Sequence, residues 1–414
     1  MACVNAPKLL MGSLCLMLSL ERLAAQAATS PDRLSPSGAN SLAQLTTPSQ
    51  SPPLYPPTAP PPRRDPLPDR RQLQEERNIG VDYRTSALQP DSRGGLWVGS
   101  WQGLARINPK TGHIYSRVSL PNTIIGALAQ DRVGRIWVGT YEGLVRVDPR
   151  TGQITAQNFA LPSNRVLALL IDKRGYLWVG TDSGLVLISP DQGLIMTTLR
   201  NLPGVSANAL SIDRQGNLWV GTLEGLVQVN TASALIMRQV TNLPGSSVQA
   251  LTSRTIAIPQ PRPPVAQPAP RPQSPPPGNA RKPAAVQKPA KPPPPPPPIL
   301  KTTLWAGTPT GLVEVDAETG QILQTVASLQ GRNVTALRFD RTDRLWTGTS
   351  NGLLRVNPRN GQIDGEIKAK LPSSRIVSLF PDAGGKLWVG TSEGLAWVSM
   401  QTFRIGVHNT FRRQ

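Results

Sequence analysis

Two sets of short, variable segments along the chain carry side chains that could bind a ligand. Arginine is frequent in the first set, and a guanidinium group forms paired hydrogen bonds with carboxylate or phosphate. Trp101 and Tyr141, in the second set, offer flat aromatic faces for stacking. We therefore expect a ligand site built from Arg84, Trp101, Tyr141, Glu142, Asn164, Arg165, Asp182, Glu224, Arg332, Asn333, Arg375 and Glu393.

Catalytic patterns are scarce in the same sequence. Both histidines, His113 and His408, lie outside the variable segments. The chain contains no nucleophile elbow, no phosphate-binding glycine loop and no His-x-x-x-His pair. We therefore expect a protein that is not an enzyme. The carboxylates of Glu142, Asp182 and Glu224 still leave acid–base catalysis open.

The variable segments are spaced by a repeat of about 41 residues, which is marked by tryptophan. Each tryptophan stands in a Leu/Ile-Trp-x-Gly-Thr/Ser block, and Gly-Leu begins three residues after the end of that block. In six of the seven copies an aspartate stands six residues before the tryptophan. In most copies an Ala/Val-Leu pair comes nine or ten residues before the tryptophan. The repeat tryptophans are Trp97, Trp137, Trp178, Trp219, Trp305, Trp346 and Trp388.

Each copy contains four short apolar runs separated by Gly and Asp/Asn-Pro turns, which predicts four antiparallel strands. One such sheet cannot bury both of its faces, but seven sheets packed around an axis can. We therefore predict an all-β protein, a seven-bladed β-propeller, in preference to an open β-solenoid. The tryptophans should pack between blades, and blade seven should close on blade one without strand exchange. The blades are expected near residues 78–120, 121–161, 162–202, 203–243, 244–329, 330–370 and 371–410.

The repeat resembles the two-component regulator propeller repeat. Leu177-Trp178-Val179-Gly180-Thr181 followed by Gly184-Leu185 carries the resemblance, and several other copies match equally well. Repeats of this family form extracytoplasmic sensor domains of bacterial hybrid histidine kinases. The resemblance covers about residues 78–409 and implies a sensor that binds a ligand. No kinase motif follows the repeats in this sequence.

The N-terminus predicts export. Lys8, the apolar run from Leu9 to Leu20 and the small-x-small sequence ending at Ala27 form a signal peptide over residues 1–27. The apolar run has 12 residues, which is too few to span a bilayer. We therefore expect the protein to be periplasmic or secreted. Both cysteines, Cys3 and Cys15, fall within this signal, so the mature chain should hold no thiolate metal site. We expect no cofactor and no metal.

Two proline-rich segments interrupt the globular composition. Residues 28–77 predict a disordered linker, and residues 256–300 predict a polyproline insertion inside blade five. The insertion has six basic residues and no acidic residue, within a chain of net charge +19. An anionic cell wall is therefore a candidate partner for residues 256–300, whereas nucleic acid is a less favoured one.

The sequence thus favours an exported, non-catalytic propeller that binds an extracytoplasmic carbohydrate, anionic small molecule or protein through its variable loops. Two alternatives stay open. One is a cell-wall-associated scaffold that uses the basic insertion as its contact. The other is a propeller lyase or glycosidase that uses the loop carboxylates.

Overall fold

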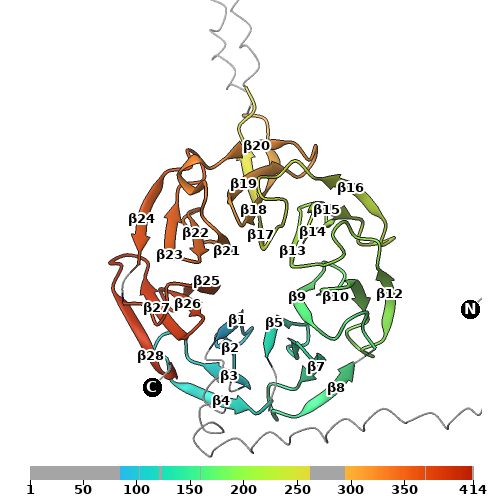
Figure 1. Ribbon diagram of the computed structural model, residues 1–414, viewed down its shortest axis with the longest axis vertical. Helices are drawn as coiled ribbons and strands as arrows, with labels where there is room; N and C mark the ends of the chain where they lie inside the picture. The colour runs from blue at the N-terminus through green and yellow to red at the C-terminus, as the bar shows by residue number, and fades with distance from the viewer. Residues whose placement is uncertain are drawn as a thin grey trace, which may run out of the picture. The chain divides into compact units, whose positions relative to one another are not determined.

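The computed structural model shows a ring of seven four-stranded antiparallel sheets, as the sequence predicted (Figure 1). It describes residues 84–412, except residues 102, 121–123, 159, 262–293 and 369. The predicted signal peptide and the linker over residues 28–77 lie outside the described residues, as does most of the insertion. No helix in the described part of the chain is long and apolar enough to cross a membrane.

Each sheet is one blade, and its strands pair in chain order, so neighbouring strands in the sequence are neighbours in space. The strands of blades one to three are β1 (Thr85–Pro90), β2 (Leu96–Ser100), β3 (Gly103–Ile107), β4 (Ile114–Val118), β5 (Ile125–Gln130), β6 (Ile136–Thr140), β7 (Gly143–Val147), β8 (Ile154–Asn158), β9 (Val166–Ile171), β10 (Leu177–Thr181), β11 (Gly184–Ile188) and β12 (Ile195–Leu199).

Blades four to seven follow the same order, and blade five ends in a 3₁₀ helix, η1 (Ala327–Leu329). Their strands are β13 (Ala209–Ile212), β14 (Leu218–Thr222), β15 (Gly225–Val229), β16 (Ile236–Val240), β17 (Ala250–Ile258), β18 (Ile299–Thr308), β19 (Gly311–Asp316), β20 (Ile322–Thr325), β21 (Val334–Phe339), β22 (Leu345–Thr349), β23 (Gly352–Val356), β24 (Ile363–Ile367), β25 (Ile376–Ala383), β26 (Lys386–Thr391), β27 (Gly394–Ser399) and β28 (Ile405–Arg412).

The first strand of every blade lies innermost, around the central opening, and the fourth strand lies at the outer edge (Figure 1). Because successive strands of a blade run in opposite directions, their connections lie on two distinct faces of the ring. Loops between second and third strands, and loops that enter each first strand, lie on one face, which we call the rim face. Turns between first and second strands, and between third and fourth strands, lie on the other, which we call the turn face.

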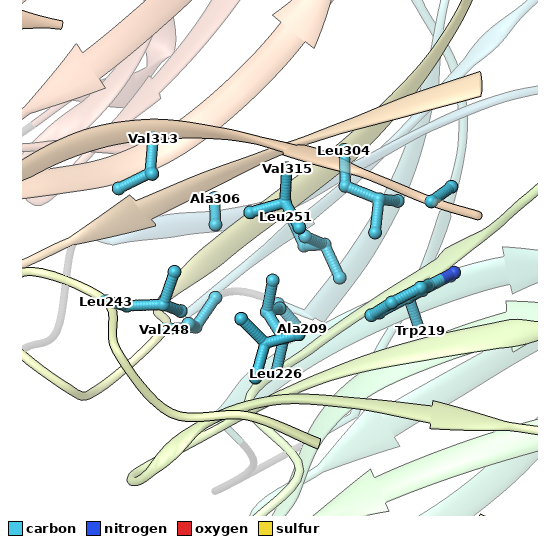
Figure 2. Packing of buried hydrophobic residues seen from close by; sticks show 12 residues of the cluster. Ala209, Trp219, Leu226, Leu243, Val248, Leu251, Leu304, Ala306, Val313 and Val315 are labelled. Atoms are coloured by element: carbon cyan, nitrogen blue, oxygen red, sulfur yellow. The ribbon is translucent and has the colours of Figure 1, made fainter. Parts of the chain in front are cut away.

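The repeat tryptophans are the packing units between blades, which confirms the prediction. All seven are almost completely buried. Trp219 of blade four packs in one cluster with Leu304, Ala306 and Val313 of blade five (Figure 2). Trp388 of blade seven contacts the blade-one core in the same way. Each blade therefore buries its own tryptophan against the next blade, and the core runs round the ring.

The repeat glycine after each tryptophan allows the blades to approach closely. A Cβ built on Gly180 would lie 2.3 Å from the backbone oxygen of Ala207 in the next blade. A Cβ built on Gly390 of blade seven would lie 2.1 Å from Ser378 Oγ of the same blade and 2.1 Å from Thr85 O of blade one. A side chain at the repeat glycine would clash with the next blade, so close packing between blades requires glycine there.

Blade seven closes on blade one by packing, without strand exchange, as predicted. Ser378 Oγ donates a hydrogen bond to Thr85 O at 2.9 Å, and Trp388 Nε1 donates to Pro109 O at 3.2 Å. His408 Nε2 lies 2.7 Å from Gly112 O. These contacts join residues nearly 300 positions apart in the chain.

The repeat aspartate shapes the turn between the first and second strands. In blade four, Asp213 Oδ1 accepts from the Asn217 backbone at 2.8 Å, and its Oδ2 accepts from Trp219 Nε1 at 3.2 Å. The same oxygen accepts from Asn217 Nδ2 and Gln228 Nε2. One buried carboxylate therefore fixes a turn, an indole and an amide together.

Replacing Asp213 with alanine should lower the free energy of unfolding by about 1–3 kcal/mol, because several buried donors lose their acceptor. Urea denaturation measures the change. The matched control is Asn230→Ala, whose side chain caps a more exposed turn by accepting from Ala232 and Ser233. If both variants lose equal stability, the buried carboxylate has no special role.

Blade five carries an extended hairpin where the insertion leaves the sheet. β17 and β18 stay paired out to Ile258 and Ile299, so the ladder reaches into residues 256–300. Lys301 forms an ion pair with Asp316 at 2.7 Å, which fixes the hairpin against the end of its own blade. In Figure 1 the extension points outward from the ring beyond β20.

Candidate functional site

Both sets of variable segments meet on the rim face. The loop between the second and third strands bonds to the loop that enters the first strand of the same blade: Tyr141 N donates to Ile124 O at 3.0 Å. Ser350 N donates to Asn333 O, and Ser392 N donates to Arg375 O, each at 3.1 Å. These backbone bonds hold the predicted ligand-binding residues at one end of the ring.

Blades two and three place a charged and an aromatic predicted residue together. The Arg165 guanidinium carbon lies 4.5 Å from the centroid of the Tyr141 ring, a cation–π contact between neighbouring blades. Arg165 and Asn164 are exposed, and Tyr141 is half-buried. The pair therefore places a cation beside an aromatic ring on the rim face.

Arg332 is engaged elsewhere. Its Nη1 lies 2.9 Å from Glu366 Oε1, at the outer edge of blade six. The hydrogen bond from Arg332, together with one from Lys368, lowers the pKa of the Glu366 carboxyl. This guanidinium already has a carboxylate partner, so it is less able to bind an anionic ligand than Arg165.

The remaining predicted residues are spread over the rim face. Glu142, Glu224, Arg375 and Glu393 are exposed; Arg84, Trp101, Asp182 and Asn333 are half-buried. None of the twelve predicted residues, all within the described part of the chain, lines the cavity at the centre of the ring. The rim face is thus an open surface and not a closed pocket.

The central cavity has a volume of about 190 Å³, less than the roughly 300–1,000 Å³ of pockets that enclose drug-sized ligands. Its wall is formed by the first strands of all seven blades, and each strand contributes a leucine at the equivalent position. These are Leu88, Leu128, Leu169, Leu210, Leu251, Leu337 and Leu379.

Among the described residues, Arg338 is the one charged residue that lines this cavity, and the sequence prediction did not include it. It directly follows the leucine of blade six, where the other blades have Gln89, Ala129, Leu170, Ser211, Thr252 and Phe380. That departure from the repeat, on the innermost strand, is the signal that could have identified it.

Among the described residues, no group of three His, Cys, Asp or Glu side chains could hold a metal ion. The rim carboxylates Glu142, Asp182 and Glu224 belong to three successive blades.

A family model for the two-component regulator propeller matches residues 119–142, 160–183, 201–224 and 370–393. Each match begins in a loop that enters a first strand and ends in the loop after the second strand. These four segments of the chain are similar to the repeat of that family. These repeats therefore supply both sets of rim loops in blades two, three, four and seven.

Solved structures share the fold at low sequence identity. The extracellular domain of the putative hybrid two-component system BT4673 from B. thetaiotaomicron is 18% identical, with a TM-score of 0.56 over 76% of this chain. The match covers 38% of that chain, so this protein spans well under half its length.

Two further solved structures also share the fold. Virginiamycin B lyase from Staphylococcus aureus is 14% identical, with a TM-score of 0.53 over 75% of this chain and 92% of that one. A chain of the mitotic checkpoint complex is 15% identical, with a TM-score of 0.55 over 76% of this chain and 86% of that one. No curated protein matches the sequence. Likeness at these identities establishes the fold alone.

Proposed function

We propose that this protein is an exported, non-catalytic binding module that recognises an extracytoplasmic ligand through its rim face. The observation that carries the proposal is the contrast between a repeated scaffold and variable loops gathered at one end of it. Loops on a rigid scaffold are the usual place for binding residues. The similarity to two-component regulator propeller repeats, and a fold shared with an extracellular domain of such a system, support a sensing role.

The ligand class follows from the Arg165–Tyr141 pair and its surroundings. An exposed guanidinium binds a carboxylate or phosphate, and the neighbouring ring packs against a flat apolar face. An acidic carbohydrate combines both features, so it is the ligand class that we favour. Arg375 and Trp101 extend the same face through blades seven and one.

The combined variant Trp101→Ala, Arg165→Gln and Arg375→Gln should weaken ligand binding by about tenfold or more, because it removes charge-assisted bonds and a stacking face. The probe is an array of neutral and uronic-acid oligosaccharides, followed by calorimetry on those bound by the unmodified chain. Arg359→Gln, on the exposed turn face, is the matched control and should bind as the unmodified chain does. Equal binding by the triple variant would exclude the rim face.

Export is tested separately by N-terminal sequencing of protein recovered outside the cytoplasm. We expect the mature chain to begin directly after Ala27. A retained N-terminal methionine would contradict export by a cleaved signal.

A second candidate function is a scaffold that contacts an anionic cell wall through the basic insertion. The specific observation that favours it is the β17–β18 hairpin, which stays paired beyond the blade and ends in the insertion. Deleting residues 262–293 keeps the paired strands and should abolish co-sedimentation with isolated cell walls while leaving rim-face binding unchanged. The triple rim variant should show the reverse.

The lyase or glycosidase alternative rests on the loop carboxylates alone. Turnover of a polysaccharide that disappears in both Glu142→Gln and Glu224→Gln would favour it over the binding module.

A further inference from the structure

The central cavity contains an isolated positive charge. Arg338, whose side chain is exposed, lies on β21 and lines a space walled by first strands, and no carboxylate among the described residues lines that space. Its one hydrogen bond runs from Nη1 to the neighbouring Leu337 O at 3.3 Å, which leaves the other guanidinium N–H groups without a described acceptor. The protein walls around this group lower the pKa of Arg338 by desolvation.

Three polar side chains of the cavity wall form hydrogen bonds between blades. Thr335 Oγ1 donates to Ile376 O at 2.6 Å, and Ser378 Oγ donates to Thr85 O at 2.9 Å. Ser86 Oγ donates to Ile125 O. These bonds connect adjacent blades, so they do not satisfy Arg338.

Arg338 lies two residues before Asp340, where the first strand ends at the turn face. The turns on that face carry exposed basic residues next to the repeat aspartate: Arg93, Arg132, Lys173 and Arg214, in blades one to four. Arg132 donates to Lys173 O, and Lys173 Nζ donates to Arg214 O, so the turns of blades two to four touch one another. Ser92 N of blade one donates to Gln130 Oε1 of blade two, so the turns of blades one to four form a continuous basic arc at the turn-face ends of the first strands.

The carboxylates of these turns do not neutralise the arc. Asp91 pairs with Arg106, Asp131 with Arg135, and Asp172 with Arg174. Asp213 is buried and occupied by neutral donors. None of the four arc residues forms an ion pair with a carboxylate in the described part of the chain.

We propose that the turn-face mouth of the central cavity binds an oxyanion, with Arg338 at the base of the site and Arg93, Arg132, Lys173 and Arg214 around its entrance. Guanidinium groups form paired hydrogen bonds with carboxylate and phosphate. The cavity volume admits a single phosphate or carboxylate group and excludes a large ligand. The site lies on the opposite face from the rim loops, so it is independent of the proposed function.

Inorganic phosphate and pyrophosphate are the probes, and calorimetry on the full chain at low ionic strength is the measurement. Arg338→Gln should weaken binding by about tenfold, since a hydrogen bond to a charged group contributes about 1.5–3 kcal/mol. Lys173→Gln combined with Arg214→Gln should give a smaller loss and a shallower dependence on salt. Arg200→Gln, an exposed arginine outside both proposed sites, is the charge-matched control and should change nothing.

The thermal midpoint of each variant without probe shows whether it is folded. Because Arg338→Gln removes an exposed charge that pairs with no described carboxylate, we expect this variant to be about as stable as the unmodified chain. The proposal is overturned if the unmodified chain binds neither probe, or if folded Arg338→Gln binds them with unchanged affinity. It is equally overturned if Arg375→Gln causes the larger loss, because the anions would then occupy the rim face.

Discussion

Replacing Trp178 with alanine is expected to lower the free energy of unfolding by about 3–5 kcal/mol. The side chain is fully buried, and its Nε1 donates to Asp172 Oδ2 at 3.2 Å. It packs in one cluster with Ala207, Leu218 and Val220 of blade four. Alanine would therefore open a cavity at the contact between blades three and four, and would leave a buried carboxylate oxygen with one donor fewer. Urea denaturation followed by circular dichroism measures the loss.

Two companion variants separate the causes of that loss. Trp178→Phe keeps most of the packing and removes the indole hydrogen bond, so it should cost about 1–2 kcal/mol. Tyr115→Ala removes an aromatic ring that is 53% exposed on the outer strand β4, and it should cost less than either. A Trp178→Ala cost no greater than that of Tyr115→Ala would show that the tryptophans do not hold the blades together.

Replacing Gly390 with alanine should destabilise the ring by about 3 kcal/mol, at the upper end of the cost of overpacking. The added methyl group would lie 2.1 Å from Thr85 O, a backbone atom that cannot rotate away. It would also lie 2.1 Å from Ser378 Oγ, which donates the hydrogen bond to Thr85 O between blades seven and one. Relief of the clash requires the two blades to separate where the ring closes.

Gly331→Ala is the control for this prediction. A methyl group there meets nothing within 4 Å, but the backbone φ of 76° is unfavourable for alanine. The expected cost is about 1–2 kcal/mol from backbone strain alone. Thermal denaturation of both variants, with limited proteolysis to detect an opened ring, provides the comparison. Equal costs would mean that closure tolerates the added methyl group.

The fold could be predicted because the information for it is local and repeated. A strand needs four to six residues of the right pattern, a turn needs an Asp and a Gly, and each blade contacts only its neighbours. Trp219 therefore predicts the same packing as Trp178, since the residues around each come from its own repeat and the next. The absence of strand exchange followed from the same reasoning, because all copies contain four strands.

The candidate site could be predicted only in part. Strand alternation placed Tyr141 and Arg165 on one face, but it could not show that they contact each other. Arg332 has a sequence context like that of Arg375, yet it pairs with Glu366 from an outer strand 34 residues away. Which partner a long, charged side chain selects depends on distances across the sheet that the repeat pattern does not contain.

The sequence by itself determined the number of blades, the strands in each, the role of the tryptophans and the face on which the variable loops gather. Tertiary structure alone decided that Arg338 lines the central cavity and that the basic turns of blades one to four adjoin. The physical reason is that a periodic pattern encodes contacts within a blade and between neighbours. The cavity is formed by seven strands at once, and a charge on one of them acquires its environment only when the ring closes.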